Sequence, residues 1–128
     1  MSPASDGKKD TRKQKGALAE EATVCYLIEQ GYRIVERNWR NRTGEIDIIA
    51  DDKGTLVFIE VRSRSGISTF GTPSESVNFR KISQVRNTAQ QYLHYRKSYD
   101  VPIRFDVVAV ILNPDMSVAS IEHIEQAF

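Results

Sequence analysis

The sequence predicts one α/β domain with a mixed sheet, in the order helix, three strands, helix, strand, strand. Two segments, 12–30 and 73–95, carry apolar residues at helical spacing. Short runs rich in Ile, Val and Phe lie between and after them, and such runs are typical of strands. Three successive strands and a helical connection to a further strand predict both antiparallel and parallel pairs. The 128 residues suffice for one core, so we expect a single domain over residues 12–128.

The first helix is expected over residues 12–30, because Gly31 supplies a stop signal directly after it. Its buried stripe is predicted to contain Leu18, Ala22 and Cys25. The single cysteine is therefore interpreted as a core residue. Residues 1–11 mix Ser, Pro, Gly and Lys without periodicity, and we expect them to form a mobile basic tail.

Strands are expected over five segments: 33–39, 44–49, 57–62, 104–112 and 118–124. The second and third segments are joined by Asp51-Asp52-Lys53-Gly54, which predicts a hairpin. The fourth contains the unbroken apolar run Val107–Ile111, which indicates a central strand covered on both faces. The second helix is expected to bury the stripe Val77, Ile82, Val85, Ala89, Tyr92 and Leu93.

The predicted hairpin brings acidic side chains together on one face. Because side chains alternate along a strand, Glu60 and Arg62 share one face of the third strand. A two-residue loop at Lys53-Gly54 places Asp47 directly opposite Glu60, with their Cβ atoms about 5 Å apart, and Glu45 on the same face. Two carboxylates on an apolar floor repel each other and lose hydration. A divalent cation such as Mg²⁺ or Mn²⁺ relieves both costs, so the hairpin predicts a metal site.

The same spacing fits a second interpretation without a metal. On a half-exposed antiparallel face, Glu60 would simply pair with Arg62 or Arg64. A hairpin loop with an odd number of residues would also divide the acidic residues between the two faces. From spacing alone, both interpretations stay open.

The distribution of charge is more informative than the net charge of +1. Basic residues cluster near the N-terminus, between residues 33 and 42, and along the second predicted helix. Such stripes suit a surface that follows phosphates, although solvated helix and strand faces carry similar charges. No apolar run reaches the roughly 20 residues of a membrane helix, and no signal peptide is visible. We expect a cytoplasmic protein that does not contact membranes.

Two further residues are interpreted as structural. Asp106 interrupts a hydrophobic strand, and a buried carboxylate needs donors. We therefore expect an arginine or backbone amides to hold it. Trp39 is expected to pack in the core rather than to stack on a base.

Several short motifs follow one another in a fixed order from about Gln14 to Phe128. They are Gly16-Ala17-Leu18-Ala19-Glu20, Glu36-Arg37-Asn38-Trp39-Arg40, Gly44-Glu45-Ile46-Asp47, Phe58-Ile59-Glu60-Val61-Arg62, Phe70-Gly71-Thr72-Pro73, Arg104-Phe105-Asp106-Val107-Val108 and Ile124-Glu125-Gln126-Ala127-Phe128. In these motifs the chain resembles the YraN family of bacterial proteins, which is similar to archaeal Holliday-junction resolvases within the PD-(D/E)XK nuclease superfamily. The resemblance implies a restriction-endonuclease-like core in the order αβββαββ.

The resemblance also implies the roles of individual residues. Glu20, Asp47, Glu60 and Arg62 would be catalytic. Asp47 and Glu60 would bind Mg²⁺ or Mn²⁺, with the carbonyl oxygen of Val61 as a further ligand. Glu20 would come to the site from the first helix, and its alternative is an exposed helix carboxylate. Arg62 stands where the motif has lysine; arginine stays charged and cannot act as a base.

The partner implied by the resemblance is DNA, with contacts from Arg40, Arg42, Arg64 and Lys81. Lys81 would supply an ammonium group in place of the missing motif lysine, or it is a solvated helical lysine. The expected function is metal-dependent cleavage of branched or non-standard DNA structures in repair or recombination. The alternative is a nucleic-acid-binding module or partner protein with a nuclease fold and little or no catalysis. Because a resolvase cuts two symmetric strands, we expect a homodimer.

Overall fold

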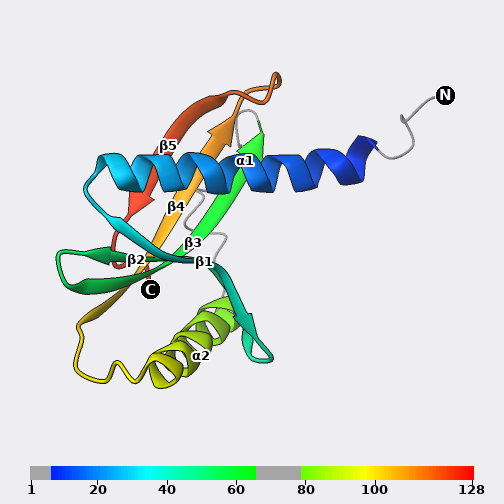
Figure 1. Ribbon diagram of the computed structural model, residues 1–128. Coiled ribbons are helices and arrows are strands. Elements are labelled where there is room, and N and C mark those ends of the chain that lie inside the picture. The colour runs from blue at the N-terminus through cyan, green and yellow to red at the C-terminus, as the bar shows by residue number, and fades with distance from the viewer. Residues whose placement is uncertain (1–6, 66–78) are drawn as a thin grey trace.

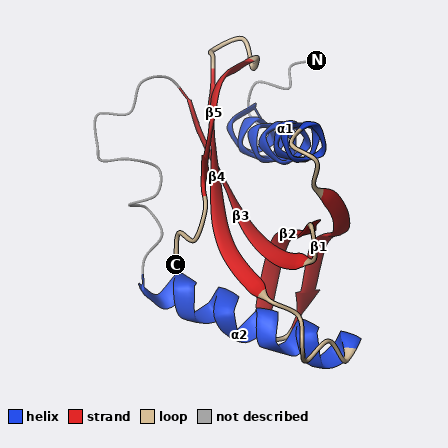
Figure 2. Cartoon of the chain, turned by 90° about the vertical axis from the view of Figure 1, so that its left-hand side faces the viewer, coloured by secondary structure: helices blue, strands red, loops and turns tan. Residues whose placement is uncertain are grey.

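Five strands form one mixed sheet, and one helix lies on each of its faces (Figure 1, Figure 2). The computed structural model describes residues 7–65 and 79–128. The elements are α1 (Gly7–Glu29), β1 (Arg33–Asn41), β2 (Gly44–Asp52), β3 (Thr55–Ser65), α2 (Phe79–Arg96), β4 (Ile103–Leu112) and β5 (Val118–Ile124). Their order and the mixed α/β class are those expected from the sequence.

The strands lie side by side in chain order, from β1 to β5. Neighbouring strands are antiparallel except for β3 and β4, which are parallel. The parallel pair arises because the chain leaves the end of β3 and returns through α2 to the start of β4, as a parallel connection requires. Neither helix of the described chain combines the length and the apolar composition needed to cross a membrane.

Helix α1 differs from the prediction in its start and in its buried face. It begins at Gly7, so residues 7–11 are helical, and residues 1–6 lie outside the described part. The buried positions are Ala19, Thr23 and Leu27, four residues apart, together with Val24, whereas Cys25 is exposed. The predicted core position of the cysteine is therefore wrong. Thr23 can be buried because its hydroxyl donates to the carbonyl of Ala19 at 2.7 Å, which satisfies the polar group inside the helix.

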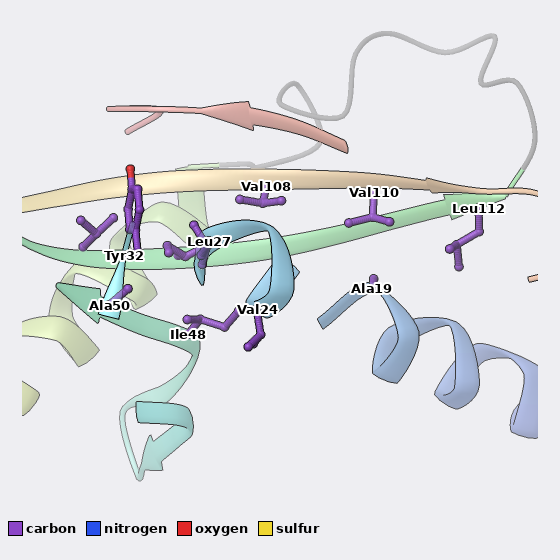
Figure 3. Close-up of a cluster of buried hydrophobic side chains, with 11 residues drawn as sticks. Ala19, Val24, Leu27, Tyr32, Ile48, Ala50, Val108, Val110 and Leu112 are labelled. Atoms are coloured by element: carbon purple, nitrogen blue, oxygen red, sulfur yellow. The ribbon is translucent and has the colours of Figure 1, made fainter. Parts of the chain in front are cut away.

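The first core lies between α1 and the sheet. Figure 3 shows Val24 and Leu27 of α1 beside Ile48 of β2 and Val108 of β4. Ala19 lies beside Val110 and Leu112 at the end of β4, where its own small side chain lets the helix approach the strand closely. This packing places the middle of α1, with Glu20, over the sheet.

The second core lies between α2 and the opposite face of the sheet. Four of the predicted stripe residues are buried there: Val85, Ala89, Tyr92 and Leu93. The predicted helix residues 73–78 lie outside the described part. Trp39 packs edge-on against Tyr92, with ring centroids 5.1 Å apart, and its prediction as a core residue is confirmed.

Helix α2 also touches the start of β2 closely. A Cβ atom on Gly44 would lie 2.8 Å from Thr88 Oγ1 and 2.9 Å from Gln84 Cγ. Glycine is therefore needed here for close packing rather than for an unusual backbone angle. This contact fixes α2 relative to the β2–β3 hairpin.

Candidate active site

The β2–β3 hairpin has the register that the sequence predicts, but its ladder is shorter. Lys53 and Gly54, with φ values of 52° and 98°, form a two-residue turn, and Asp52 pairs with Thr55. The ladder continues to Ile48↔Ile59 and ends there. Asp47 and Glu60 are the next two residues, so they lie where the strands separate. The expectation that they are directly opposed within the ladder is therefore corrected.

The separation coincides with an irregular residue in β1. Asn38 has a φ of 53°, in the left-handed region that asparagine tolerates better than most residues. On one side of it Arg37 reaches α1, and on the other Trp39 packs towards α2. Strand β2 changes in the same way, because Ile48 belongs to the core under α1 and Ile46 to the core under α2. In a regular strand, Ile46 and Ile48 would lie on the same face. Here they lie on opposite faces, and Asp47 lies at the change of face.

Asp47 is held at the point where the strands part. Its Oδ2 atom accepts a hydrogen bond of 2.8 Å from the backbone N–H of Val61. The carboxylate thus accepts a hydrogen bond from a backbone amide of the neighbouring strand beyond the end of the ladder. It also lines a cavity of about 220 Å³ together with Gly16, Ala19, Glu20, Val61 and Ser63. Asp47 therefore stands beside α1 and β3 at once.

Glu60 lies close to Asp47 and is almost fully buried, with 5% of its surface exposed. Its Oε1 atom lies 3.4 Å from Nζ of Lys81, on α2. Burial raises the pKa of Glu60, although the charges of Lys81 and Arg62 oppose the shift. Burial, and then repulsion from Glu60, raises the pKa of Asp47 to about 7, against the hydrogen bond from Val61. The charge of Glu60 thus acts on Asp47 in the direction that two repelling carboxylates predict.

Arg62 and Lys81 are the cations that act on this pair. The charge of Arg62 lowers the pKa of Glu60, and the guanidinium is partly buried. Within the described residues, Nε of Arg62 is buried and has no hydrogen-bond partner. Lys81 is the larger electrostatic influence on Glu60. Its interpretation as a merely solvated helical lysine is wrong, because α2 packs so that the ammonium reaches a buried carboxylate.

Glu20 reaches the same cavity as Asp47 but has partners of its own. Its Oε2 atom accepts hydrogen bonds from Asn38 Nδ2 at 2.8 Å and from Arg37 Nε at 3.2 Å. It is therefore not the freely exposed helix carboxylate of the alternative interpretation. Arg37 and Asn38 were not predicted to belong to the site. An asparagine in the middle of a predicted strand was the signal in the sequence, because asparagine is typical of left-handed positions.

The remaining predicted DNA contacts are three arginines that do not line the cavity of Asp47 and Glu20. Arg40 is largely exposed and pairs with Glu45 at 2.8 Å, as expected for Glu45. Arg42 is exposed in the turn between β1 and β2. Arg64 is partly buried near the end of β3. Arg40 and Arg42 thus lie at and just before the β1–β2 turn, next to α2, whereas Arg64 lies near the end of β3, which points away from that turn (Figure 1).

Comparison with known proteins assigns the family. The model of a family described as the uncharacterised protein family UPF0102 matches residues 19–110. A UPF0102 protein of Desulforamulus reducens is 48% identical over 118 residues, covering 91% of this chain and 96% of the relative. One from Moorella thermoacetica is also 48% identical over 118 residues, covering 92% and 98%. The chain belongs to the UPF0102 family. The expected membership of the YraN family is thereby confirmed.

The donor set of this UPF0102 protein suits a hard cation with few protein ligands. Across residues 7–65 and 79–128, no three His, Cys, Asp or Glu side chains are grouped as a complete metal cage. Mg²⁺ usually binds through one or two carboxylates and keeps several waters or substrate phosphates as its other ligands. Asp47 and Glu60 are the two carboxylates that could serve in this way, and the raised pKa of Asp47 reflects a carboxylate whose charge is poorly neutralised by the protein.

A second buried carboxylate in the UPF0102 chain is fully neutralised. Asp106 accepts two hydrogen bonds from Arg104 at 2.9 and 3.0 Å, one of 3.1 Å from the N–H of Gln126, and contacts Nε2 of His123 at 2.7 Å. These donors outweigh burial and lower the pKa of Asp106. The prediction that an arginine or backbone amides hold this residue is confirmed. Asp106 is structural.

Proposed function

We propose that the protein is a metal-dependent endonuclease that acts on DNA. The observation that carries the proposal is the pair Asp47 and Glu60 at the opening of the β2–β3 hairpin. Both carboxylates have a raised pKa, and each raises the free energy of the folded state when it is ionised. Such pairs are typical of catalytic sites, where an ion or a substrate completes the charge balance.

In this proposal Asp47 and Glu60 hold Mg²⁺ or Mn²⁺, with the carbonyl oxygen of Val61 as a further ligand. A bound ion of this kind lowers the pKa of a water molecule and stabilises negative charge on a phosphate. The N–H of Val61 keeps the Asp47 carboxylate in one orientation through the 2.8 Å hydrogen bond. Glu20 lines the same cavity and is oriented by Asn38, which suits a residue that positions the attacking water.

The two neighbouring cations take complementary roles. Arg62 has a buried Nε–H without a partner among the described residues, and such a donor is suited to a phosphate oxygen. Because arginine does not deprotonate, it stabilises charge and does not act as a base. Lys81, 3.4 Å from Glu60, supplies the ammonium group that the usual lysine would contribute. Arg40, Arg42 and Arg64 contact the DNA backbone on either side.

The proposal also includes a restriction-endonuclease-like fold and a branched DNA substrate. A mixed sheet with the parallel pair β3–β4 and one helix on each face supports a restriction-endonuclease-like core. Branched or otherwise non-standard DNA is the proposed substrate on the strength of the resemblance to Holliday-junction resolvases. Symmetric cleavage of two strands would require a homodimer.

Arg62 also favours a second candidate function. Without a lysine at this position, the protein would bind DNA in the same orientation but cleave it weakly or not at all. The carboxylates would then bind a cation that bridges the protein and a phosphate. Lys81 bears on the choice between the candidates, since its ammonium group lies 3.4 Å from Glu60.

Calorimetric titration with Mn²⁺ tests the metal site. The wild type is compared with Asp47→Ala combined with Glu60→Ala, and with Asp51→Asn as a matched control on the same strand, where Asp51 pairs with Arg33 at 3.1 Å. We expect binding by the wild type and the control and none by the double variant. Equal heats from all three proteins would refute the site.

A cleavage assay then separates the enzyme from the binding module. Four-way junctions, flaps, duplexes and single strands are incubated with and without Mn²⁺. We expect metal-dependent cutting of a branched substrate, faster for Arg62→Lys and slower for Lys81→Ala. Binding without cutting by both the wild type and Arg62→Lys would favour the second candidate.

A further inference from the structure

An exposed aromatic side chain stands at the C-terminal end of α2, away from the carboxylates. Tyr95 is 68% exposed, although its ring is held by Trp39 at 6.0 Å and by Tyr92 at 6.5 Å between centroids. The two supporting rings belong to the core under α2. Tyr95 is therefore held by two rings on its protein side, and it presents a flat apolar surface to the solvent. We call Tyr95 with the supporting Trp39 the aromatic platform.

Positive charge flanks the aromatic platform. Arg96 is partly exposed and is fixed by a 2.7 Å hydrogen bond to the hydroxyl of Tyr92, with Glu36 at 3.7 Å. Lys97 follows it and is exposed. Arginine and lysine beside an exposed ring are the groups that bind a nucleotide, since the ring accepts the base and the cation accepts the phosphate.

The platform lies on the same edge of α2 as the candidate active site. Lys81, Gln84, Thr88, Tyr92 and Tyr95 are spaced by three or four residues, so they form one line along the helix. Thr88 and Tyr92 are buried, so only Lys81, Gln84 and Tyr95 of this line are accessible from the solvent. Contacts confirm this line. Lys81 reaches Glu60, Gln84 donates to the carbonyl of Thr43 at 3.3 Å, and Tyr92 and Tyr95 contact Trp39.

The length of this line matches a short stretch of nucleic acid. From Lys81 to Tyr95 the helix rises by roughly 21 Å, at about 1.5 Å per residue. A strand with about 3.4 Å between nucleotides covers that distance in roughly six nucleotides. The turn between β1 and β2, which carries Arg40 and Arg42, lies beside the middle of the line through the contact of Thr43 with Gln84. Cations are thus present at both ends and beside the middle.

We propose that Tyr95 stacks on an unpaired base of the nucleic acid, roughly six nucleotides from the scissile phosphate. This proposal rests on the proposed function and specifies its substrate class as a nucleic acid with unpaired bases near the cut. A continuous duplex keeps its bases stacked inside the helix and does not offer one to an exposed ring. A single-stranded arm, gap or junction does.

Trp39 provides a direct readout, because it is the only tryptophan of the chain and lies 6.0 Å from Tyr95. Its fluorescence is measured in EDTA while a single-stranded thymidine oligonucleotide of about twelve nucleotides is added, about twice the span of the line. The control is an abasic oligonucleotide of the same length, which has the phosphates without the bases. We expect a change in emission and tighter binding with thymidine only. Equal responses to both oligonucleotides would overturn the proposal.

Tyr99 supplies a matched control residue. It is 67% exposed, like Tyr95, but its ring contacts His94 rather than Trp39. We expect Tyr95→Ala to weaken thymidine binding about fivefold or more, the loss of one base–aromatic stack, while Tyr95→Phe and Tyr99→Ala bind like the wild type. The abasic oligonucleotide should bind all four proteins equally. Equal weakening by Tyr95→Ala and Tyr99→Ala would refute the assignment.

The test is independent of metal binding and cleavage. The variant Asp47→Ala with Glu60→Ala should keep the full thymidine response in EDTA. Loss of Mn²⁺ binding or of cleavage would then refute the proposed nuclease without affecting the platform. Conversely, an active nuclease whose Tyr95→Ala variant binds thymidine unchanged would refute the platform alone. A change in Trp39 emission on adding a protein partner, and none with thymidine, would indicate a protein-docking surface instead and would also refute it.

Discussion

Two aspartates in this protein, Asp106 fully buried and Asp47 half-buried, differ in how their charge is balanced. Asp106 is fully buried and receives hydrogen bonds from Arg104 and Gln126 and a contact from His123, so its pKa is lowered. Asp47 has one backbone donor, stands next to Glu60, and has a pKa raised to about 7. The negative charge of Asp106 is balanced by groups of the protein itself. Part of the negative charge of Asp47 is left unbalanced by groups of the protein.

The difference separates structural from functional charge. Both aspartates have apolar neighbours on each side in their strands, so a sequence pattern alone treats them alike. What distinguishes them is the number of donors that tertiary packing brings to each. A carboxylate without sufficient donors destabilises the folded state, and such sites are retained where function requires them. The comparison therefore makes opposite predictions for the two residues.

The largest effect is expected for Asp106→Asn. The substitution removes the negative charge that Arg104 and His123 face, and it leaves the guanidinium without its principal partner. We expect a loss of about 3 kcal/mol in the free energy of unfolding, as for other broken buried charge pairs. Urea denaturation followed by circular dichroism measures it. A loss below about 1 kcal/mol would mean that the network contributes little.

The dependence on pH sharpens this prediction. The folded-state pKa of Asp106 lies below the ordinary value of 3.8, so its contribution to stability is complete above that value and is lost as the pH falls through the folded-state pKa. We therefore expect the difference between wild type and Asp106→Asn to shrink on acidification below about pH 4. A difference that does not change with pH would show that it does not come from ionisation.

Asp47→Asn is expected to stabilise the protein at neutral and alkaline pH. The folded-state pKa, about 7, exceeds the ordinary 3.8, so the folded protein binds a proton more tightly and loses stability as the pH rises from about 4 to 7. Asparagine does not ionise, and its carbonyl can still accept the hydrogen bond from Val61. We expect a gain of about 1 to 2 kcal/mol at about pH 8, because screening and the weaker hydrogen bond reduce the full effect.

The control for Asp47→Asn is the same measurement at about pH 4, where the wild-type carboxyl is protonated in the folded state and the gain should vanish. Asp51→Asn, on the same strand but paired with Arg33, should show no such gain. An Asp47→Asn protein that is less stable than the wild type at about pH 8 would contradict the unfavourable charge at this position.

Local patterns were sufficient for much of the fold and for part of the site. The order of elements follows from apolar spacing, and the hairpin register follows from the Lys53-Gly54 turn. Asn38 was the only sequence signal of the change of face, and it is not sufficient alone, because a left-handed conformation there depends on tertiary contacts such as the hydrogen bond to Glu20. The contact of Lys81 with Glu60 depends on how α2 packs, and no spacing rule gives it. The burial of Thr23 was also not predictable from apolar spacing, because it depends on the hydrogen bond from its hydroxyl to the carbonyl of Ala19.

Added Mn²⁺ should stabilise the wild type and Asp106→Asn more than Asp47→Asn. If Asp47 and Glu60 hold the ion, free Mn²⁺ at about ten times its Kd stabilises the wild type by about 1.4 kcal/mol, which corresponds to about 3 to 6 °C in Tm. Asp106→Asn should gain the same increment, because its metal site is intact. Asp47→Asn should gain much less. Thermal unfolding with and without Mn²⁺ measures this, and equal gains in all three proteins would indicate binding elsewhere.

The smallest effect on stability is expected for Lys81→Gln. The ammonium is partly exposed, at 36%, so its pair with Glu60 is screened and its removal costs at most about 1 kcal/mol. Its charge nevertheless lowers the pKa of Glu60 and repels a bound cation. We therefore expect Lys81→Gln to bind Mn²⁺ more tightly than the wild type in calorimetry, whereas Arg80→Gln, one residue away and exposed, should not. Weaker Mn²⁺ binding by Lys81→Gln would mean that the lysine organises the carboxylates rather than competing with the ion for them.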